Sequence, residues 1–188
     1  FSSTGYARDQ FRAAMGEVSP EEISGVFNAT SAVLTHPYAP WKVGHQNNVY
    51  YEGKIRQQVE LEVLAMEDML GVNCLTLLLT DPVGKRETRW IAEDSNQNVW
   101  LVHSSGDGIS QSEPFILIPA NPENGWKSWE NASAIPLNYS VIMKFPAITR
   151  VPKLSSLSDC IHVLIKHHDS GHMESYANGL GLVKFFNL

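Results

Sequence analysis

Residues 58–65 read QVELEVLA, and this stretch decides the fold class because apolar and polar side chains alternate along it. Successive side chains of a β-strand point to opposite faces of the sheet. One face of this segment is therefore apolar and suited to a core, and it consists of Val59, Leu61, Val63 and Ala65. The other face is mostly polar. The stretch predicts a strand that is buried on one side and meets solvent on the other.

Similar runs recur at short spacing toward the C-terminus, separated by clusters of turn residues. The runs read VNCLTLLLT, KRETRWIAE, NVWLVH, FILI, SVIMKF, CIHVLIKHH, HMESYA and LVKFF. The turns between them include DPVG at 81–84, DSNQN at 94–98, SSGDG at 104–108, NPENG at 121–125 and DSG at 169–171. Because no helical pattern intervenes, we expect a mainly β fold in which a strongly curled antiparallel sheet forms an open or half β-barrel.

The segment before the strands has a helical pattern instead. The sequence SPEE at 19–22 is a capping signature and predicts a helix over about residues 20–28. Apolar residues at helical spacing predict an earlier short helix over about residues 7–15. We therefore expect a helical segment, 1–37, that packs on an antiparallel β domain, 38–188, within one globular domain.

Size and composition exclude several classes of protein. The 188 residues are 43% hydrophobic and 18% charged, which is compatible with one folded core. The net charge of −6 argues against nucleic acid as a partner, because a phosphate backbone calls for a clustered basic face. No apolar run approaches the roughly 20 residues that span a bilayer, so no transmembrane segment is expected. A removed export signal is compatible with this sequence, as is a cytosolic chain.

The sequence Gly179-Leu180-Gly181 has the G-x-G spacing of some phosphate-binding loops. Such a loop requires a strand before it and a helix after it. Only LVKFFNL follows Gly181, and these residues read as a strand. We therefore interpret the two glycines as a sharp bend, or a close approach, in the last strand.

Four motifs in a fixed order resemble a β-rich domain of uncharacterised bacterial lipoproteins and secreted proteins. They are RWIAEDSNQNVWLV, IPANPENGWKSWE, DCIHVLI and ESYANGLGLVKF, and YAPWKVGHQNNVYYEGK resembles the opening of the same domain. The likeness covers about residues 38–187. It departs from the pattern at Asn47, where an aromatic residue is usual, and at Gln97, which replaces a hairpin glycine. The resemblance implies a curled antiparallel sheet in an extracytoplasmic setting, periplasmic or secreted and possibly lipid-anchored upstream of Phe1, and implies no known reaction.

The two cysteines lie in separate apolar runs rather than in a C-x-x-C motif, which excludes a zinc ribbon. The residues alone leave two buried thiols or one disulfide open. The extracytoplasmic setting that the resemblance implies favours a disulfide between Cys74 and Cys160, because that compartment permits it.

Two clusters have the residue types of metal sites. In a three-residue hairpin at 169–171, His168 would face His172, and Asp169 or Glu174 could add a third ligand. An exposed polar hairpin tip explains the same residues and is the interpretation we favour. The alternating oxygen donors of 94–98 lack the glycine and distal glutamate of a calcium loop, so we expect an ordinary turn there.

Candidate ligand-binding residues are four of the five tryptophans of the chain. Trp90 and Trp100 flank the 94–98 turn, and Trp126 and Trp129 follow the NPENG turn. Aromatic side chains at a barrel mouth can bind an apolar ligand, and they can equally fill the barrel.

The sequence offers no catalytic motif and no cofactor signature. We therefore expect a non-enzymatic extracytoplasmic binding or scaffold domain, with an apolar groove for a lipid-like or peptide ligand. One alternative is a module that binds a protein partner, or its own copy, through an edge strand. Another is a metal-dependent enzyme that uses the hairpin at 167–174.

Overall fold

The computed structural model describes residues 27, 33–52, 57–69, 72–106, 109–110, 115–125, 139–151, 156–167 and 170–187. Within these residues the regular secondary structure is entirely β, and it forms one sheet of eleven strands. The strands are β1 (Gln46–Glu52), β2 (Gln57–Met69), β3 (Val72–Thr80), β4 (Arg86–Glu93), β5 (Val99–Gly106), β6 (Ile109–Ser110), β7 (Phe115–Ile118), β8 (Tyr139–Thr149), β9 (Leu157–His167), β10 (Ser170–Ala177) and β11 (Gly181–Asn187).

The strand order is β6-β5-β4-β3-β2-β1-β11-β10-β9-β8, and β7 also pairs with β5. Strands β1–β6 pair in sequence order, and so do β8–β11, and all of these pairs are antiparallel, as is the pair of β7 with β5. The exception joins the two ends of the β region, where β1 and β11 lie side by side and run parallel. The sheet is therefore mixed, and the expectation of a purely antiparallel sheet is wrong at this one contact.

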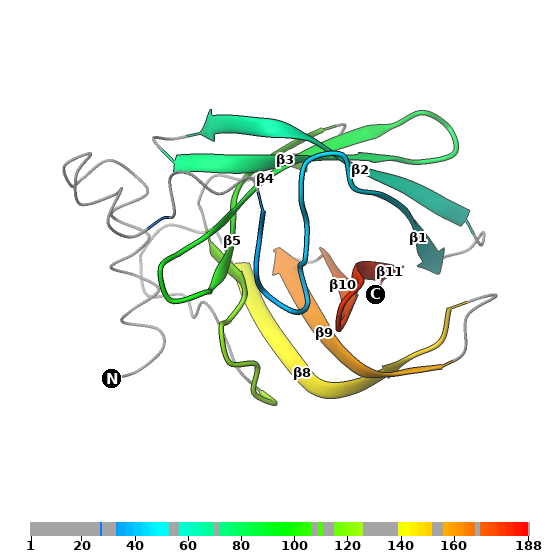
Figure 1. Cartoon of the computed structure of the whole chain (residues 1–188). Coiled ribbons are helices and arrows are strands. Elements are labelled where there is room, and N and C mark those ends of the chain that lie inside the picture. Colours follow the sequence, from blue (N-terminus) through cyan, green and yellow to red (C-terminus); the bar gives the residue numbers. More distant parts are fainter. Residues whose placement is uncertain are drawn as a thin grey trace.

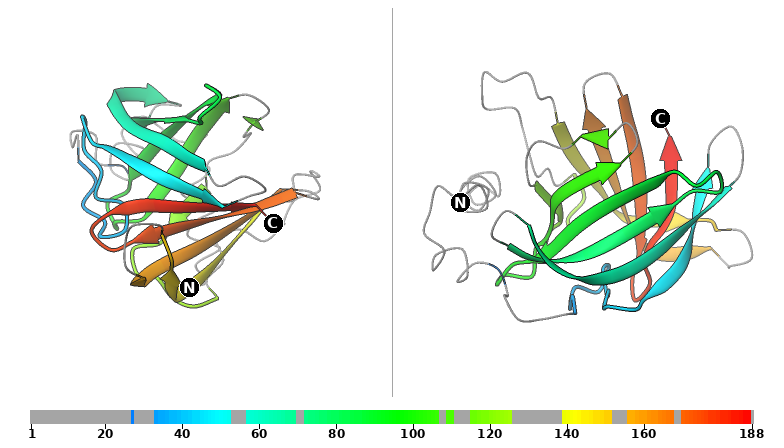
Figure 2. Two further views of the ribbon diagram at one scale, coloured as in Figure 1. Left: turned by 90° about the vertical axis from the view of Figure 1, so that its right-hand side faces the viewer. Right: turned by 90° about the horizontal axis from the view of Figure 1, so that it is seen from above.

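The sheet curls into a half-barrel whose two sides face each other, with β1–β4 on one side and β8–β11 on the other (Figure 1). Figure 2 shows the strands of the two sides crossing at a steep angle. The main core fills the space between them and takes side chains from both sides, among them Leu61, Leu77, Ile91, Ile161 and Leu182, each no more than 1% exposed. The curled sheet thus encloses packed side chains rather than an open channel.

Residues 119–125 bridge the gap between the two ends of the curled sheet. They follow β7, and the amide of Gly125 donates to the carbonyl of Met143 on β8 at 2.8 Å. The amide of Phe145 donates to Asn124 Oδ1 at 3.4 Å. Part of the outer backbone of β8 is therefore already hydrogen-bonded within the chain.

The two helices expected near the N-terminus, over 7–15 and 20–28, lie outside the described residues, except for Phe27 in the second. There Phe27 forms an isolated antiparallel bridge with Asp94, so a helix does not extend over Phe27. The described residues contain no helix, and hence none that is long and apolar enough to cross a membrane.

Strand β2 confirms the alternation of QVELEVLA up to Val63 and then departs from it. Leu61 and Val63 are each 1% exposed, as the apolar face requires. The pairing with β3 shifts between Val63 and Ala65, so that Leu64 is accommodated by a bulge and is 42% exposed. A bulge adds one residue to a strand and reverses the face of those that follow. Met66, rather than Ala65, consequently packs against the main core.

Residues 33–45 form a strap that crosses one end of the half-barrel (Figure 1). The strap folds back on itself, with the amide of Leu34 donating to the carbonyl of Trp41 at 2.8 Å. Its tip reaches the other side of the barrel, where Gly179 donates to the carbonyl of Pro37 at 2.7 Å. The Tyr38 hydroxyl donates to Asp159 Oδ1 at 2.5 Å. At its other end the amide of Gly44 donates to the carbonyl of Val63 on β2 at 2.9 Å, so the strap links β2 to the β9–β10 side.

An ion pair crosses the interior of the half-barrel. Arg89 on β4 donates from Nη1 and Nη2 to both carboxylate oxygens of Glu174 on β10, at 2.8 and 2.7 Å. His172 and Tyr176 bond to the same carboxylate, at 2.6 and 2.5 Å. Burial raises the pKa of Glu174, but the charge of Arg89 and the hydrogen bond from His172 outweigh burial and hold it far below its usual range.

The Gly179-Leu180-Gly181 segment is a turn into the last strand, as the sequence predicts. Both glycines adopt a positive φ, 77° at Gly179 and 82° at Gly181. A Cβ at Gly179 would meet open space, whereas a Cβ at Gly181 would lie 2.8 Å from Nε1 of Trp41. Gly181 is therefore required both by its backbone conformation and by the packing of the strap on β11.

These two glycines provide a matched pair of substitutions. We expect Gly179→Ala to lower the free energy of unfolding by about 1 to 2 kcal/mol, the cost of a left-handed conformation. Gly181→Ala should cost an additional ~1 to 3 kcal/mol, because its methyl group also collides with buried Trp41. Urea unfolding of both variants measures the difference. Equal losses would show that Trp41 does not pack on Gly181.

The interior ion pair leads to a second prediction. Arg89→Met leaves the carboxylate of Glu174 buried without its cation and should cost about 3 to 5 kcal/mol of unfolding free energy. Adding Glu174→Met removes the stranded charge, so the double variant should be more stable than Arg89→Met alone. A double-mutant cycle from urea unfolding tests this expectation. Additive losses in the cycle would contradict a direct interaction.

Candidate functional site

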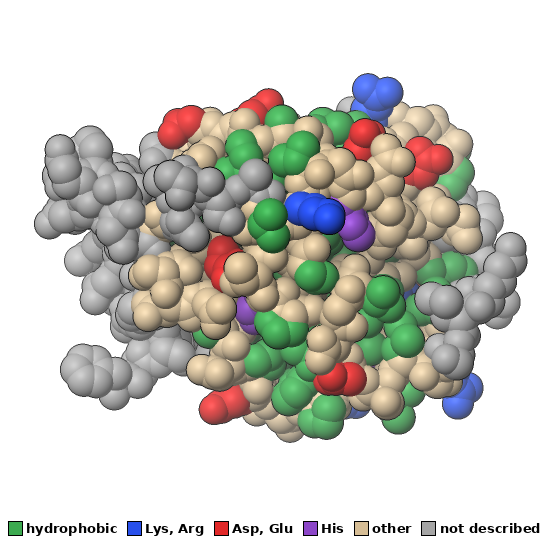
Figure 3. Space-filling model, viewed as in Figure 1, with side chains coloured by type: hydrophobic (Ala, Val, Ile, Leu, Met, Phe, Trp, Pro, Cys, Tyr) green, Lys and Arg blue, Asp and Glu red, His purple; other side chains and the backbone are tan. Residues whose placement is uncertain are grey.

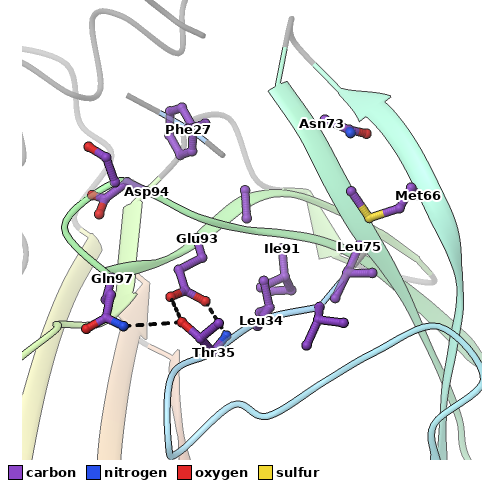
Figure 4. Close-up of a pocket in the computed structure, with 13 residues that line it drawn as sticks. Phe27, Leu34, Thr35, Met66, Asn73, Leu75, Ile91, Glu93, Asp94 and Gln97 are labelled. Atoms are coloured by element: carbon purple, nitrogen blue, oxygen red, sulfur yellow. Dashed lines mark hydrogen bonds between the residues drawn. The ribbon is translucent and has the colours of Figure 1, made fainter. Parts of the chain in front are cut away.

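A pocket of about 420 Å³ lies at the rim of the half-barrel, where the strap meets the ends of β2, β3 and β4. Figure 4 shows side chains from all of these elements around it. The apolar part of its wall is formed by Phe27, Val33, Leu34, Met66, Leu75, Ile91 and Ala92. The polar part is formed by Thr35, Asn73, Glu93, Asp94, Ser95 and Gln97. The pocket is thus apolar on one side and polar on the other.

Local features of two elements place the apolar wall. The bulge at Leu64 turns Met66 toward the interior, where it faces Leu75 on the neighbouring strand. The strap contributes Leu34, which is 5% exposed and belongs to the main core. The apolar side of the pocket is therefore a continuation of the barrel core that the strap does not completely fill.

Glu93, the last residue of β4, is fixed at the polar side of the pocket by Thr35. The amide of Thr35 donates to Oε2 of Glu93 at 2.6 Å, and the Thr35 hydroxyl donates to Oε1 at 2.5 Å. Gln97 Nε2 in turn donates to the Thr35 hydroxyl at 3.3 Å (Figure 4). The carboxylate is consequently held in one orientation between the strap and the end of β4.

Asp94 stabilises the 94–98 turn instead of forming a calcium loop. Its Oδ1 accepts from the amides of Asn96 and Asn98, and its Oδ2 accepts from Asn98 Nδ2 and from Trp100 Nε1. All four donors lie within 3.0 Å, so the carboxylate is fully engaged. Gln97 has a φ of 67°, the left-handed region that favours the glycine expected at this position.

His36 connects the pocket to the segment that follows β7. Its Nε2 lies 2.8 Å from the carbonyl oxygen of Pro119 and must donate, and its Nδ1 accepts from the amide of Tyr38 at 3.2 Å. This arrangement needs a neutral ring, because a protonated Nδ1 would face a second donor. Burial lowers the pKa of His36 more than its bond to Pro119 and the charge of Glu93 raise it.

The tryptophans expected to bind a ligand do not line this pocket. Trp100 is fully buried in a second apolar cluster, which contains Phe27 and lies on the opposite face of β3–β5 from the main core. Trp90 packs against the same cluster and donates to Glu67 Oε2 at 3.0 Å. Trp126 and Trp129 lie outside the described residues. Among the described tryptophans, Trp41 belongs to the main core and is 1% exposed.

The expected metal-binding hairpin has a different register. His167 pairs with Ser170, and His172 lies opposite Ile165 rather than His168. His168 and Asp169 themselves lie outside the described residues. His172 hydrogen-bonds to Glu174, whose carboxylate is bound to Arg89. Among the described residues, no three His, Cys, Asp or Glu side chains form a group that could hold a metal ion.

The two cysteines are free and buried, so the disulfide that the resemblance implies is not formed. Cys74 belongs to the second apolar cluster, with Trp100. Cys160 belongs to a third cluster that contains Ala147 and Val183. The physical reason is that the two thiols pack into separate clusters on different strands. Burial raises the pKa of Cys74 to about 12, so its thiol stays protonated at neutral pH.

Sequence reasoning misses the residues that define the pocket, above all Thr35 and Glu93. The sequence does contain an indication of Glu93. Arg89, Ile91 and Glu93 occupy every second position of β4 and so share one face, which is the inner one. No local pattern indicates Thr35, because its contact with Glu93 joins residues 58 positions apart.

The neutral state of His36 predicts a pH dependence. Below its ordinary pKa of about 6.5, the unfolded chain binds a proton at His36 that the folded chain resists. The free energy of unfolding should therefore decrease as pH falls from 7.5 to 5.8. His36→Gln should lose less stability across this interval than the wild type in urea unfolding at both pH values. An equal loss would contradict a neutral, buried His36.

Comparisons with models of known protein families, with curated proteins and with solved structures find no match to this chain. The resemblance to the β-rich domain of bacterial secreted proteins, and the extracytoplasmic location that it implies, stay predictions. What the site can do must be argued from its geometry.

Proposed function

We propose that this chain is a non-enzymatic binding domain that holds the apolar part of a lipid-like or peptide ligand in the rim pocket. The observation that carries this proposal is the unfilled volume of about 420 Å³ between the strap and the ends of β2–β4. Pockets that bind small ligands are typically concave, largely apolar and supplied with a few fixed polar groups. The rim pocket has an apolar wall and a carboxylate, Glu93, that two hydrogen bonds hold in place.

The packing of the interior supports the rim, rather than a groove between the two sides of the barrel, as the binding place. The interior is occupied by the main core and by the ion pair of Arg89 and Glu174. A ligand there would have to displace close-packed side chains, which costs several kcal/mol. At the rim, a ligand would add contacts to Val33, which is 45% exposed, and to the partly buried Met66 without displacing core side chains.

Edge pairing with a partner is less well supported. Outer backbone groups of β8 at Met143 and Phe145 are bonded to residues 124–125. Pro146, which has no amide proton, follows on the same strand. The face in Figure 3 shows hydrophobic side chains interspersed with polar ones.

Extracytoplasmic localisation belongs to the proposal through the resemblance alone.

Two valines of the strap allow a controlled test. Val33 lines the pocket and is 45% exposed, whereas Val43 is 44% exposed and does not line it. Val33→Trp should fill the mouth of the pocket and weaken binding of the neutral apolar probe N-phenyl-1-naphthylamine at least about tenfold in a fluorescence titration. Val43→Trp should leave binding unchanged. Absence of saturable probe binding by the wild type, or equal affinities of the two variants, would overturn the proposal.

A further inference from the structure

We infer that the ligand of the rim pocket carries a positive charge, as an amine or ammonium group attached to a short apolar chain. This inference rests on the proposed function and specifies the ligand of the same site. Its basis is the charge of the lining: the described residues that line the pocket include the carboxylates of Glu93 and Asp94 and no Lys, Arg or His. A cation in the pocket would therefore be attracted and an anion repelled.

The two carboxylates have different roles. Asp94 already accepts four hydrogen bonds, so it contributes negative charge and no further acceptor. Among the residues that the structure describes, Glu93 accepts two hydrogen bonds, both from Thr35. An ionised carboxylate offers about four acceptor positions, so Glu93 retains capacity for the N–H groups of an amine. Because Thr35 fixes its orientation, the carboxylate loses little freedom when a ligand binds.

The apolar wall determines where the rest of the ligand lies. Val33, which is 45% exposed, and Met66, which is partly buried, present apolar surface to the pocket, and the core residue Leu34 lies behind them near Glu93 (Figure 4). A chain of several methylene groups laid on this wall would gain roughly 0.8 kcal/mol for each one buried. The carboxylate and the apolar wall meet at one pocket, which matches a ligand with a cationic end and an apolar body.

Displacement of N-phenyl-1-naphthylamine from the wild-type protein at pH 7 tests this inference. Octylamine, octanol and octanoate carry the same chain with a positive, neutral or negative end. Octylamine should displace the probe at a concentration at least about fivefold lower than octanoate, with octanol between them. The preference should decrease with added salt, since salt screens the attraction.

Two variants assign the preference to Glu93. Glu93→Gln should abolish the preference for octylamine. Glu62→Gln removes the same charge from β2 at a position that does not line the pocket, and it should leave the preference unchanged. Persistence of the preference in Glu93→Gln would overturn the role of Glu93. If that variant fails to fold, Ser95→Lys places a cation at an exposed lining position and should weaken the preference for octylamine over octanoate at least about twofold; an undiminished preference would have the same meaning.

The results for the inference and for the proposed function are distinguishable. Saturable probe binding with equal displacement by octylamine and octanoate would overturn the cationic ligand while leaving a binding pocket. Absence of probe binding would overturn the pocket itself. Amine preference in the wild type that is lost in Glu93→Gln and kept in Glu62→Gln would support both.

Discussion

The ion pair between Arg89 and Glu174 is the interaction on which the shape of the barrel depends. Two charges removed from water are tolerated only if each finds its partner with good geometry, and this bidentate pair, joined by His172 and Tyr176, satisfies that condition. Because β4 and β10 lie on opposite sides of the curled sheet, the pair fixes the separation of the two sides. A closer approach would compress the pair, and a wider one would leave buried charges unpaired. The ion pair and the main core therefore occupy the interior, and the unfilled volume lies at the rim.

The strap forms one wall of the rim pocket, over the end of the half-barrel that the ion pair helps to hold in shape. It is attached to the β9–β10 side at Tyr38 and Gly179, and to the segment after β7 at His36. These attachments hold Leu34 and Thr35 over the ends of β3 and β4, at a distance set by the width of the barrel. The pocket is thus the volume left between a strap of fixed position and a core of fixed width. Its polar side is fixed by the same elements, since Thr35 orients Glu93.

Much of this fold is predictable from local sequence, and the failures have a common cause. Alternation in QVELEVLA and the turn clusters predict the strands, because each depends on neighbouring residues. The parallel contact of β1 with β11, the bulge at Leu64 and the Arg89–Glu174 pair depend on residues far apart in sequence, which periodicity does not report. The hairpin at 167–170 fails for a subtler reason: glycine at position 171 suggests a three-residue loop, whereas cross-strand packing imposes the register of His172 with Ile165.

The ligand-site prediction shows why residue type alone is a weak guide in a β-barrel. Trp90 and Trp100 are large and amphipathic, so a mouth position is reasonable for them. Each instead packs in the second apolar cluster, on the face away from the main core, and donates its indole N–H to a carboxylate, Glu67 or Asp94. Successive residues of a strand lie on opposite faces of the sheet. Trp90 therefore lies on the face opposite to that of Ile91 and Glu93. The same alternation along β4 places Glu93 on the inner face, together with Ile91 of the main core. Glu93 thus lies at the inner end of β4, beside a turn whose Asp94 carboxylate is already fully hydrogen-bonded and beside apolar lining residues, and this combination is the basis of the ligand that we propose for the rim pocket.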